Sequence, residues 1–468
     1  MRALGLAAAL VVLTGAGAGV QTPDTRGADR SGGADRSGGA DRSGGADLVR
    51  SAIITGATLI NPTAAAPVAD TVIVISGSRI TQVATAASVK PAAGADVIDA
   101  RGKFVIPGLA DMHNHLEDGG ISRQQNKAGN LGRLLAVGVT TVFDPGVAES
   151  DFARLKSAAA ADAAPYARFF GTGPAITIPG GSLGEQGPAP TTVEDARAVV
   201  QKLKAANVDA IKIHRDDLAW ASKRTMQPMA LDVLQALVDE THRLGLRAYV
   251  HAPQLLRAKE ALRAGVDGLM HGIIDEPIDQ EFIVLMKKNG AVYVPTLGMF
   301  EDVADVGAFG KRQAPYWDQL GLQPPGIYQF LTSTQGMQIF QSFLSNTAFT
   351  KEHLPMLRAN MQRTFAAGIP IVMGSDTGFF GVLLGVATPL EMELMVEAGL
   401  TPAQTIAAAT INAARMIGRE NEQGSVETGK AADLLILDAN PREDIRAIRR
   451  IHRVVKGGVV HDPARLPK

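Results

Sequence analysis

The chain has 468 residues, of which 46% are hydrophobic and 20% charged, a composition typical of a globular protein with a large core. Its 46 lysines and arginines nearly balance 47 aspartates and glutamates, so no overall positive field attracts a polyanion, and we expect no nucleic-acid partner. With 0 cysteines the chain has no disulfides, thiolate nucleophiles or cysteine metal sites, so any bound metal must use histidine, carboxylate or lysine-derived ligands.

Residues 1–20 have the features of a secretory signal peptide. Arg2 precedes an apolar run from Leu4 to Leu13, and the small residues Ala16-Gly17-Ala18 that follow suit signal peptidase. Because this run is about half of the roughly 20 residues that span a bilayer, we expect cleavage, export to the periplasm or the extracellular medium, and no stable membrane insertion. Retention of the segment as a membrane anchor is the alternative.

Residues 21–47 form a low-complexity segment. The hexad Gly-Ala-Asp-Arg-Ser-Gly runs three times and begins a fourth time, and each copy has one Asp, one Arg and no large apolar side chain. Such a segment cannot bury enough surface to offset the entropy lost on ordering it. We therefore predict a flexible tether that carries no chemistry.

Short β-branched runs lie near both ends of the rest of the chain, for example at residues 71–75 and 454–460. This similarity of the two ends predicts a small composite β-sandwich domain built from residues 48–104 and 421–468. Between the ends, eight strand-like apolar runs alternate with amphipathic helical patterns. This alternation predicts an α/β fold with a (β/α)8 TIM-type barrel over residues 105–420.

Two features of the predicted barrel bear on function. The interval from Gly298 to about Thr350 is too long for a simple connection, so we expect a lid or substrate loop there. Six residues that can bind metal or transfer protons fall at or near the C-terminal ends of predicted strands, where barrel active sites form. They are His113, His115, Lys212, His251, His271 and Asp376. In the extended segment 113–115 the two histidines face one side and can reach one ion.

These residues lie in stretches that resemble the amidohydrolase superfamily of metal-dependent hydrolases. Residues 105–115, Val-Ile-Pro-Gly-Leu-Ala-Asp-Met-His-Asn-His, resemble the first-strand signature of that family. Gly374-Ser375-Asp376 resembles its eighth-strand carboxylate, and residues 429–434 resemble its return into the β domain. Residues 209–213 and 264–272 are similar to the branch that contains imidazolonepropionases and metal-dependent Xaa-Pro dipeptidases.

The resemblance implies a centre with two divalent cations, expected to be zinc. One ion would bind His113, His115 and Asp376, and the other would bind His251 and His271. Lys212 would react with carbon dioxide to form a carbamate that bridges both ions. A bridging hydroxide would then attack the carbonyl of a small amide or dipeptide-like substrate, while the catalytic residue Asp376 carries a proton to the leaving nitrogen.

Two positions depart from the pattern of this branch. Pro253 lies two residues after the fifth-strand ligand, where relatives commonly carry a second histidine, and Ser182 stands where relatives often place a histidine after the third strand. The residues that would contact the substrate are therefore altered. Our candidates for substrate contacts, each of which can also serve a structural role, are His214, Arg215, Tyr293 and Trp317.

Two other functions stay open on the sequence alone. A mononuclear imidazolonepropionase-like ring opener or a deaminase would not use Lys212 as a ligand. Gln254 argues against deamination, because many mononuclear deaminases of this fold carry a glutamate proton shuttle at that spacing. The third hypothesis is a non-catalytic, secreted metal-binding protein. The sequence does not name the substrate or the native metal, and it is compatible with a homo-oligomer.

Overall fold

The computed structural model describes residues 51–85, 96–116, 127–181, 187–320, 329–330, 332–379 and 381–466. The predicted signal peptide, the predicted tether and Ser182 lie outside these residues. Among the described helices, none is long and apolar enough to cross a membrane.

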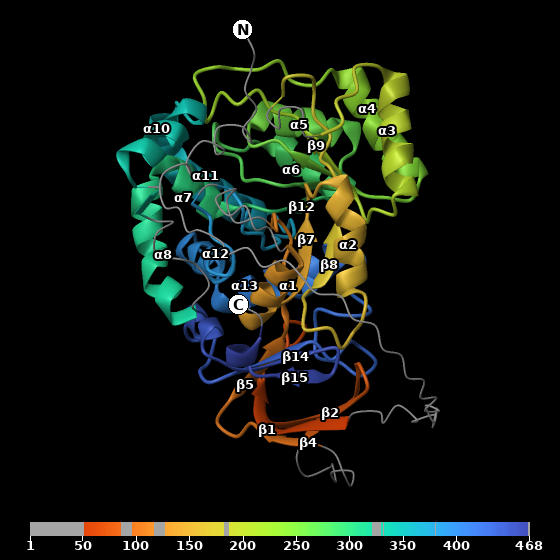
Figure 1. The fold of residues 1–468 in the computed structure, drawn as a ribbon, viewed down its shortest axis with the longest axis vertical. Helices are drawn as coiled ribbons and strands as arrows, with labels where there is room; N and C mark the ends of the chain where they lie inside the picture. Colours follow the sequence, from red (N-terminus) through yellow and green to blue (C-terminus); the bar gives the residue numbers. More distant parts are fainter. Residues whose placement is uncertain are drawn as a thin grey trace, which may run out of the picture.

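One eight-stranded sheet at one end of the molecule contains strands from both ends of the described chain (Figure 1). Its order is β15-β14-β13-β5-β1-β2-β3, with β4 paired to β1. The two halves join where β13 runs antiparallel to β5, so that Leu434 pairs with Pro107 and Leu437 with Phe104. The strands are β1 (Ser51–Leu59), β2 (Val68–Ser76), β3 (Arg79–Thr85), β4 (Asp96–Asp99), β5 (Phe104–Pro107), β13 (Leu434–Leu437), β14 (Ile451–Lys456) and β15 (Val459–His461).

Pairing of β13 with β5 joins strands from the two ends of the chain in one continuous sheet. The predicted β-sandwich form of this region stays a prediction. One face of the sheet buries a cluster of aliphatic side chains that includes Ile54, Ile73, Ile75 and Leu434. The division of the chain into a composite domain and a barrel domain at the predicted boundaries stays a prediction.

Parallel strands form the centre of the molecule. The first three, β6 (Leu109–Asp111), β7 (Val139–Asp144) and β8 (Arg168–Gly171), make one sheet. The next four, β9 (Ile211–His214), β10 (Ala248–His251), β11 (Gly268–Leu269) and β12 (Val292–Tyr293), make a second. Helices surround these strands, so the α/β character of the prediction is confirmed (Figure 1).

The regular ladders do not close into the predicted eight-stranded barrel within the described part of the chain. Single parallel bridges, Ile176 with Ile213 and Tyr293 with Ile371, continue the pairing beyond the two sheets. The predicted eighth strand contributes only such a bridge, because it is short and Pro370 supplies no amide hydrogen to a ladder. Backbone hydrogen bonds, such as Met112 N to Met373 O at 3.0 Å, still connect its end to the end of β6.

The helices begin with α1 (Lys127–Ala136), α2 (Glu149–Ala159), α3 (Val193–Ala205), α4 (Leu231–Arg243), α5 (Leu255–Ala264) and α6 (Gln280–Asn289). The later ones are α7 (Leu297–Ala304), α8 (Val306–Leu320), α10 (Thr334–Phe343), α11 (Thr347–Ala366), α12 (Ala387–Glu397), α13 (Pro402–Ala408) and α14 (Ile411–Met416). A short 3-10 helix, η3 (Ile445–Arg449), precedes β14. Local sequence explains several starts: the Thr192 side chain accepts a hydrogen bond from Asp195 N and caps α3.

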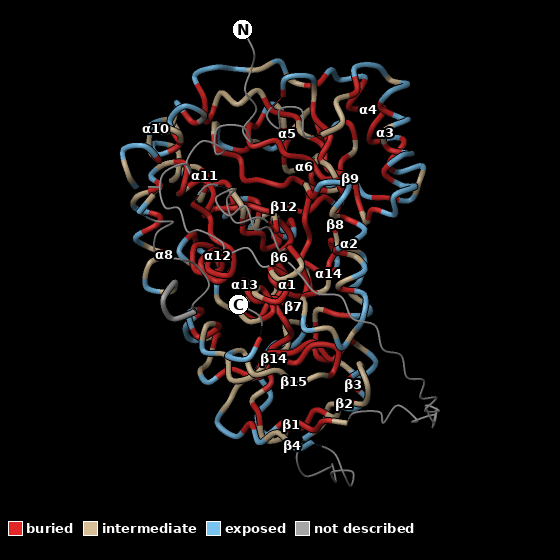
Figure 2. Tube along the Cα trace, viewed as in Figure 1, coloured by how far each residue is buried: buried red, intermediate tan, exposed pale blue. Residues whose placement is uncertain are grey.

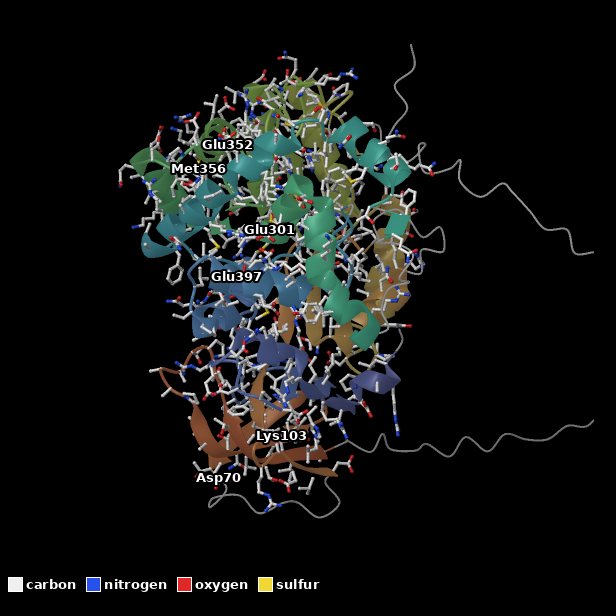
Figure 3. All side chains as sticks on the ribbon, turned by 90° about the vertical axis from the view of Figure 1, so that its left-hand side faces the viewer. Asp70, Lys103, Glu301, Glu352, Met356 and Glu397 are labelled. Carbon is white, nitrogen blue, oxygen red and sulfur yellow. The ribbon has the colours of Figure 1, made fainter. Side chains whose placement is uncertain are left out.

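The segment predicted as a lid or substrate loop is largely helical where it is described. It contains α7, α8, α10 and the first residues of α11. Ion pairs hold some of these helices together: Arg312 of α8 pairs with Glu301 of α7 and with Glu397 of α12, and Glu301 also pairs with Arg358 of α11. Figure 3 shows Glu301 and Glu397 on the same side of the molecule. The role of this segment as a lid or substrate loop stays a prediction.

Burial concentrates around the central strands and in α12 (Figure 2). In α12 each residue from Ala387 to Met395 is buried, including the polar residues Thr388, Glu391 and Glu393. A buried polar side chain needs a hydrogen-bonding partner to offset its lost hydration. The partners of these residues bear directly on the site described next.

Candidate metal centre

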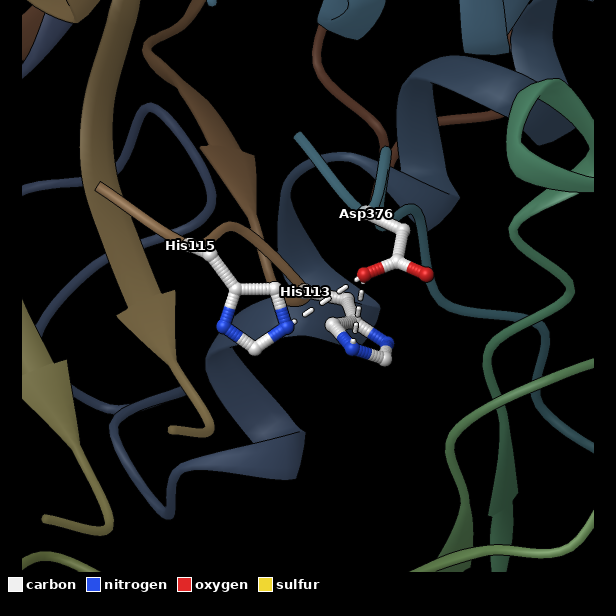
Figure 4. Close-up of side chains that lie close together, drawn as sticks. All are labelled: His113, His115 and Asp376. Carbon is white, nitrogen blue, oxygen red and sulfur yellow. Dashed lines mark ion pairs between the residues drawn. The ribbon is translucent and has the colours of Figure 1, made fainter. Parts of the chain in front are cut away.

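Three predicted ligands converge at the C-terminal end of the central strands (Figure 4). His113 and His115 follow β6, and Asp376 follows the bridge residue Ile371. The Asp376 Oδ1 atom lies 3.2 Å from His113 Nε2 and 3.4 Å from His115 Nε2. One ligand atom from each residue falls within a group no wider than 4.8 Å, which is compact enough to hold one ion. We call these three residues the first ligand group.

A buried carboxylate, Asp111, holds the backbone of the first ligand group in place. Its Oδ1 accepts hydrogen bonds from His113 N at 3.3 Å and Ser375 N at 3.0 Å. Its Oδ2 accepts from Asn114 Nδ2 at 3.1 Å and from the hydroxyls of Ser375 and Thr388, both at 2.6 Å. Asp111 thus ties the segment after β6 to the segment that carries Asp376. Asp111 therefore orients the ligand residues, and its own oxygens are engaged in hydrogen bonds to the protein.

A second carboxylate, Asp144 at the end of β7, orients His115. Asp144 Oδ1 lies 3.5 Å from His115 Nδ1, which leaves Nε2 directed toward Asp376. Burial opposes protonation of His115, but hydrogen bonds to Asp144 and Asp376 outweigh it and raise the pKa of His115 to about 10. The anionic surroundings that favour imidazolium in the metal-free chain also favour a divalent cation.

His251 and His271, which the sequence predicts as ligands of a second ion, lie beside the first ligand group, and we call this pair the second ligand group. Their ring centroids lie 4.3 Å apart, and the His271 ring lies 4.8 Å from that of His113. His251 Nε2 donates to Asp216 Oδ2 at 2.7 Å, and His271 Nδ1 hydrogen bonds with Thr296 Oγ1 at 2.9 Å. Each ring therefore has one nitrogen held by the protein, so the other nitrogen is available to a metal.

Lys212 lies in β9, and its charge acts on His113 of the first ligand group and on His271 of the second. Its side chain is buried, and burial lowers its pKa to about 7, although the negative charges of Asp376 and Asp144 act in the opposite direction. Burial also holds the pKa values of His113 and His271 well below their usual range. These groups are therefore available as neutral amine and imidazoles, the forms that react with carbon dioxide or bind metal.

The donor set fits a metal site by its own chemistry. His113 Nδ1 is a buried polar atom without a hydrogen-bond partner among the described residues. Two residues of the cluster adopt positive φ angles: the ligand candidate Asp376 at 56°, and Thr296, the partner of His271, at 47°. Such backbone is costly for side chains other than glycine and is often retained at functional sites. The cluster thus combines constrained backbone with nitrogen and oxygen donors that suit a divalent cation.

Comparison with protein families agrees with this geometry. Residues 104–460 match the amidohydrolase family, which is more than half of the chain. The chain belongs to the amidohydrolase family. The resemblance to its imidazolonepropionase and Xaa-Pro dipeptidase branch is likewise confirmed. Members of this family depend on metal ions, which agrees with the first ligand group.

Individual relatives cover different shares of this amidohydrolase. It is 39% identical over 121 residues to imidazolonepropionase of Geobacillus kaustophilus, which is 25% of this chain and 28% of that enzyme. A match to imidazolonepropionase of Brevibacillus brevis is 25% identical and spans 78% of this chain and 82% of that one. The chain thus spans less than a third of the first relative and most of the second.

Solved structures resemble this amidohydrolase over most of its length. A candidate prolidase of Bifidobacterium longum has 28% identity and a TM-score of 0.72, with 88% of this chain and 95% of that chain covered. A Xaa-Pro dipeptidase with bound methionine has 24% identity and a TM-score of 0.72, and the match covers 88% of this chain and 100% of that chain. The fold neighbours imply a TIM-barrel-like domain with a further domain.

The predicted substrate residues have different surroundings in this amidohydrolase. His214 stacks on His251 with ring centroids 4.6 Å apart, so it borders the second ligand group. Arg215 is buried and pairs with Glu260 Oε2 at 2.7 Å. The buried Tyr293 hydroxyl accepts a hydrogen bond from Ile273 N at 2.7 Å.

Those contacts give Arg215 and Tyr293 structural partners, while Arg215 Nε has no hydrogen-bond partner among the described residues. Substrate contacts by these two residues stay a prediction. Trp317 lies in α8, and its side chain is outside the described residues. Pro253 accepts a backbone hydrogen bond from Ile274 N at 2.9 Å, close to the end of β10. Among the predicted substrate residues, His214 stacks on His251, and the Arg215 backbone amide donates to His251 O at 3.0 Å.

Sequence reasoning missed three residues that orient ligands. Asp144 carries no ligand motif in the sequence; its Oδ1 accepts a hydrogen bond from Gly146 N at 2.9 Å and also lies 3.5 Å from His115 Nδ1. Asp216 follows His214 by two positions, a spacing that was an available signal for a shared direction. Thr296 follows a predicted strand, but its contact with His271 was not marked by any motif.

Proposed function

We propose that this amidohydrolase holds two divalent cations, expected to be zinc, and hydrolyses a carbon–nitrogen bond of a small amide or dipeptide-like substrate. The observation that carries the proposal is that the two ligand groups lie side by side, with the buried Lys212 near enough for its charge to act on a histidine of each. The first group would hold one ion through His113, His115 and Asp376, and the second would hold the other through His251 and His271. The distance of 4.8 Å between the His113 and His271 rings supports adjacent ions.

Lys212 would join the two ion sites as a carbamate. The neutral Nζ atom forms a bond to the carbon of carbon dioxide and releases one proton to solvent, which leaves an anion with two oxygen ligands. Burial supports this reaction, because it lowers the pKa of Lys212 to about 7 and keeps much of the amine neutral. An unmodified ammonium group would instead repel two dications.

When bound, the ions would polarise the scissile carbonyl and increase the acidity of a water molecule. Asp376 would accept a proton as water adds to the carbonyl carbon. It would then donate this proton to the nitrogen as the carbon–nitrogen bond breaks, which yields a carboxylic acid and an amine. Its position supports the role, because Asp376 contacts both histidines of the first ligand group and lies 3.9 Å from His271 Nδ1.

A second candidate function comes from the sequence relatives. Several are imidazolonepropionases, including one that covers most of the chain, whereas the similar solved structures include dipeptidases. Ring opening by a mononuclear centre would need the first ligand group but not a carbamate on Lys212. A non-catalytic metal-binding protein would need neither reaction. The binuclear hydrolase needs Lys212 and the mononuclear ring opener does not. Both of these would turn over a substrate, whereas the non-catalytic protein would not.

The test is a substrate screen with purified protein supplied with Zn²⁺ and bicarbonate. We expect metal-dependent release of amine from N-acyl amino acids or dipeptides. Asp376→Asn should lower turnover about 100-fold or more, as expected for loss of a general acid–base group. The matched control, Asp302→Asn, changes another buried aspartate outside the ligand groups and should retain turnover.

Other outcomes of the screen select the alternatives. Turnover of imidazolonepropionate that survives Lys212→Ala supports the ring opener. Two bound ions without turnover of either substrate class support the non-catalytic protein. We also propose export, which signal cleavage between residues 18 and 21 in the secreted protein would support.

A further inference from the structure

Helix α12 places two polar side chains beside the metal centre. Thr388 and Glu391 are three positions apart and therefore share one face of the helix. Both residues are buried, with exposed fractions of 0% and 1%. Neither was singled out by the sequence, and neither contacts a proposed ligand directly. Their hydrogen bonds nevertheless lead to different ligand groups.

Thr388 leads to the first ligand group through Asp111. Its hydroxyl donates to Asp111 Oδ2 at 2.6 Å, and Asp111 Oδ1 accepts from the backbone amides of His113 and Ser375. Ser375 immediately precedes Asp376. A change in the position of Asp111 would therefore move both segments that carry the first ligand group. Thr388 fixes this carboxylate from the side of α12.

Glu391 leads to the second ligand group through the start of α7. Its two carboxylate oxygens accept hydrogen bonds from Leu297 N and Gly298 N, both at 2.7 Å. The residue before Leu297 is Thr296, whose hydroxyl hydrogen bonds with His271 Nδ1 at 2.9 Å. Thr296 adopts a φ of 47°, which side chains rarely adopt without support. Glu391 supplies that support by fixing the next two amides.

We propose that Thr388 and Glu391 are positioning residues, through which α12 sets the first and second ligand groups independently. The part of this inference that concerns two ions rests on the proposed function. A rigid helix that is linked to both groups through Asp111 and the start of α7 would keep their relative position constant through the reaction, which hydrolysis by adjacent ions requires. The same geometry predicts that damage to either residue weakens one ion more than the other.

The first test measures metal affinity without substrate. Thr388→Val keeps the side-chain shape but removes the hydroxyl, so it should weaken the ion at the first ligand group about 10-fold or more, as typical for residues that orient ligands. Thr388→Ser keeps the hydroxyl and should bind the ion at the first ligand group about as tightly as the wild type does. The matched control is Thr405→Val on α13, whose buried hydroxyl has no hydrogen-bond partner among the described residues. It should leave both affinities unchanged.

The second test uses Glu391→Gln, in which one of the two amides loses its acceptor. We expect the ion at the second ligand group to weaken about 10-fold, with less effect on the first. Glu393→Gln is the control on the same helix, because Glu393 pairs with Arg449 of η3 at 2.5 Å instead of with α7. This control should lower stability without a selective change in ion affinity.

A third readout separates this inference from the binuclear proposal. In the metal-free protein, histidine ring resonances in NMR spectra should shift mainly for His113 in Thr388→Val and mainly for His271 in Glu391→Gln. If wild type binds one ion, the binuclear proposal fails while these shifts still test the positioning roles. If Thr388→Val does not fold, Ser375→Ala removes the other hydroxyl bond to Asp111 Oδ2 and gives the same readout.

The inference is overturned if Thr388→Val and Glu391→Gln leave ion affinities and ring resonances as in wild type. It is also overturned if both variants weaken the two ions equally, or if Thr405→Val has the same effect as Thr388→Val. Each of these outcomes would show that α12 contributes general stability alone.

Discussion

The two ligand groups of the centre are held in different ways. In the first, the side chains contact one another through Asp376 Oδ1, and one carboxylate, Asp111, binds both backbone segments. In the second, His251 and His271 come from different strands and have separate partners, Asp216 and Thr296. The first group is therefore organised as a unit, whereas the second is assembled from independently supported residues.

This difference indicates where the centre is sensitive to change. Loss of a partner in the second group should affect one imidazole, while loss of Asp111 should affect every ligand of the first. The charge of Lys212 acts on a histidine of each group, and Lys212 is the residue that we propose couples the two ions. Variants of these residues therefore test whether the two ligand groups are supported in these different ways.

The largest effect is expected for Lys212→Ala, which removes the proposed bridge. We expect the number of bound ions per chain to fall from two to one at most. The activity should fall further than the loss of about 10–100-fold that is typical when an orienting residue is changed. A short carboxylic acid should partly restore both by refilling the bridging position. Metal content per chain and turnover with and without the acid measure the effect.

The control for this variant is Lys456→Ala in the terminal sheet. Lys456 is also a buried lysine, but its Nζ donates to Ala161 O at 3.0 Å and Asp162 O at 2.9 Å. Its loss should lower stability and leave metal content unchanged. Substantial activity of Lys212→Ala with one ion would contradict the binuclear mechanism.

A smaller effect is expected for Asp216→Asn in the second group. The amide cannot hold His251 Nε2–H as a carboxylate does, so the second ion should bind about 10–100-fold more weakly while the first is little changed. Asp217→Asn is the neighbouring control, because Asp217 pairs with Arg257 at 3.0 Å. Competition with a metal indicator gives both affinities. Equal weakening of both ions would argue against separate support of the second group.

The stability of the metal-free protein should depend on pH in two opposite ways. The raised pKa of His115, about 10, contributes stability that is present below about 6.5 and lost as pH rises through 10. The lowered pKa of Lys212, about 7, makes stability rise with pH between about 7 and 10.5. Chemical unfolding at several pH values measures the sum.

Single variants separate these two slopes. Lys212→Met should be stabilised relative to wild type near pH 7, and this advantage should shrink as pH approaches 10. Asp144→Asn should be destabilised near pH 7 and approach wild type at high pH. Parallel curves for wild type and both variants would show that neither group titrates as inferred.

The smallest effect is expected for Trp317→Ala in α8. An aromatic side chain from this segment suits an apolar substrate wall, so relative rates among substrates should shift at constant metal content. Rates with a panel of dipeptides that differ in side-chain size measure the change. An equal loss for each substrate would indicate that Trp317 acts in packing alone.

The residues that we propose as ligands were easier to identify in the sequence than the residues that orient them. His113 and His115 were recognisable because a two-residue spacing and strand-end positions are local properties. The long-range partners were not: Thr388 lies 277 positions from Asp111 along the chain, and no local pattern links them. Asp216 was within reach of the same alternation that placed His214.

The fold was predicted in outline for similar reasons. Alternating strand and helix patterns indicated the α/β architecture, since periodicity depends on nearby residues. The segment expected to be a lid or substrate loop contains helices, and Ser333, which caps α10 by accepting a hydrogen bond from Gly336 N at 3.1 Å, was a readable start for one of them. Merging of the two terminal strand sets into one sheet depends on the β13–β5 pairing, which the sequence does not encode locally.

A crystal structure of the protein loaded with Zn²⁺ in the presence of bicarbonate tests the central claim most directly. We predict two ions, one at His113, His115 and Asp376 and one at His251 and His271, with continuous electron density from Lys212 Nζ to a carboxylate that contacts both. A single ion in the first ligand group beside an unmodified Lys212 would contradict the account.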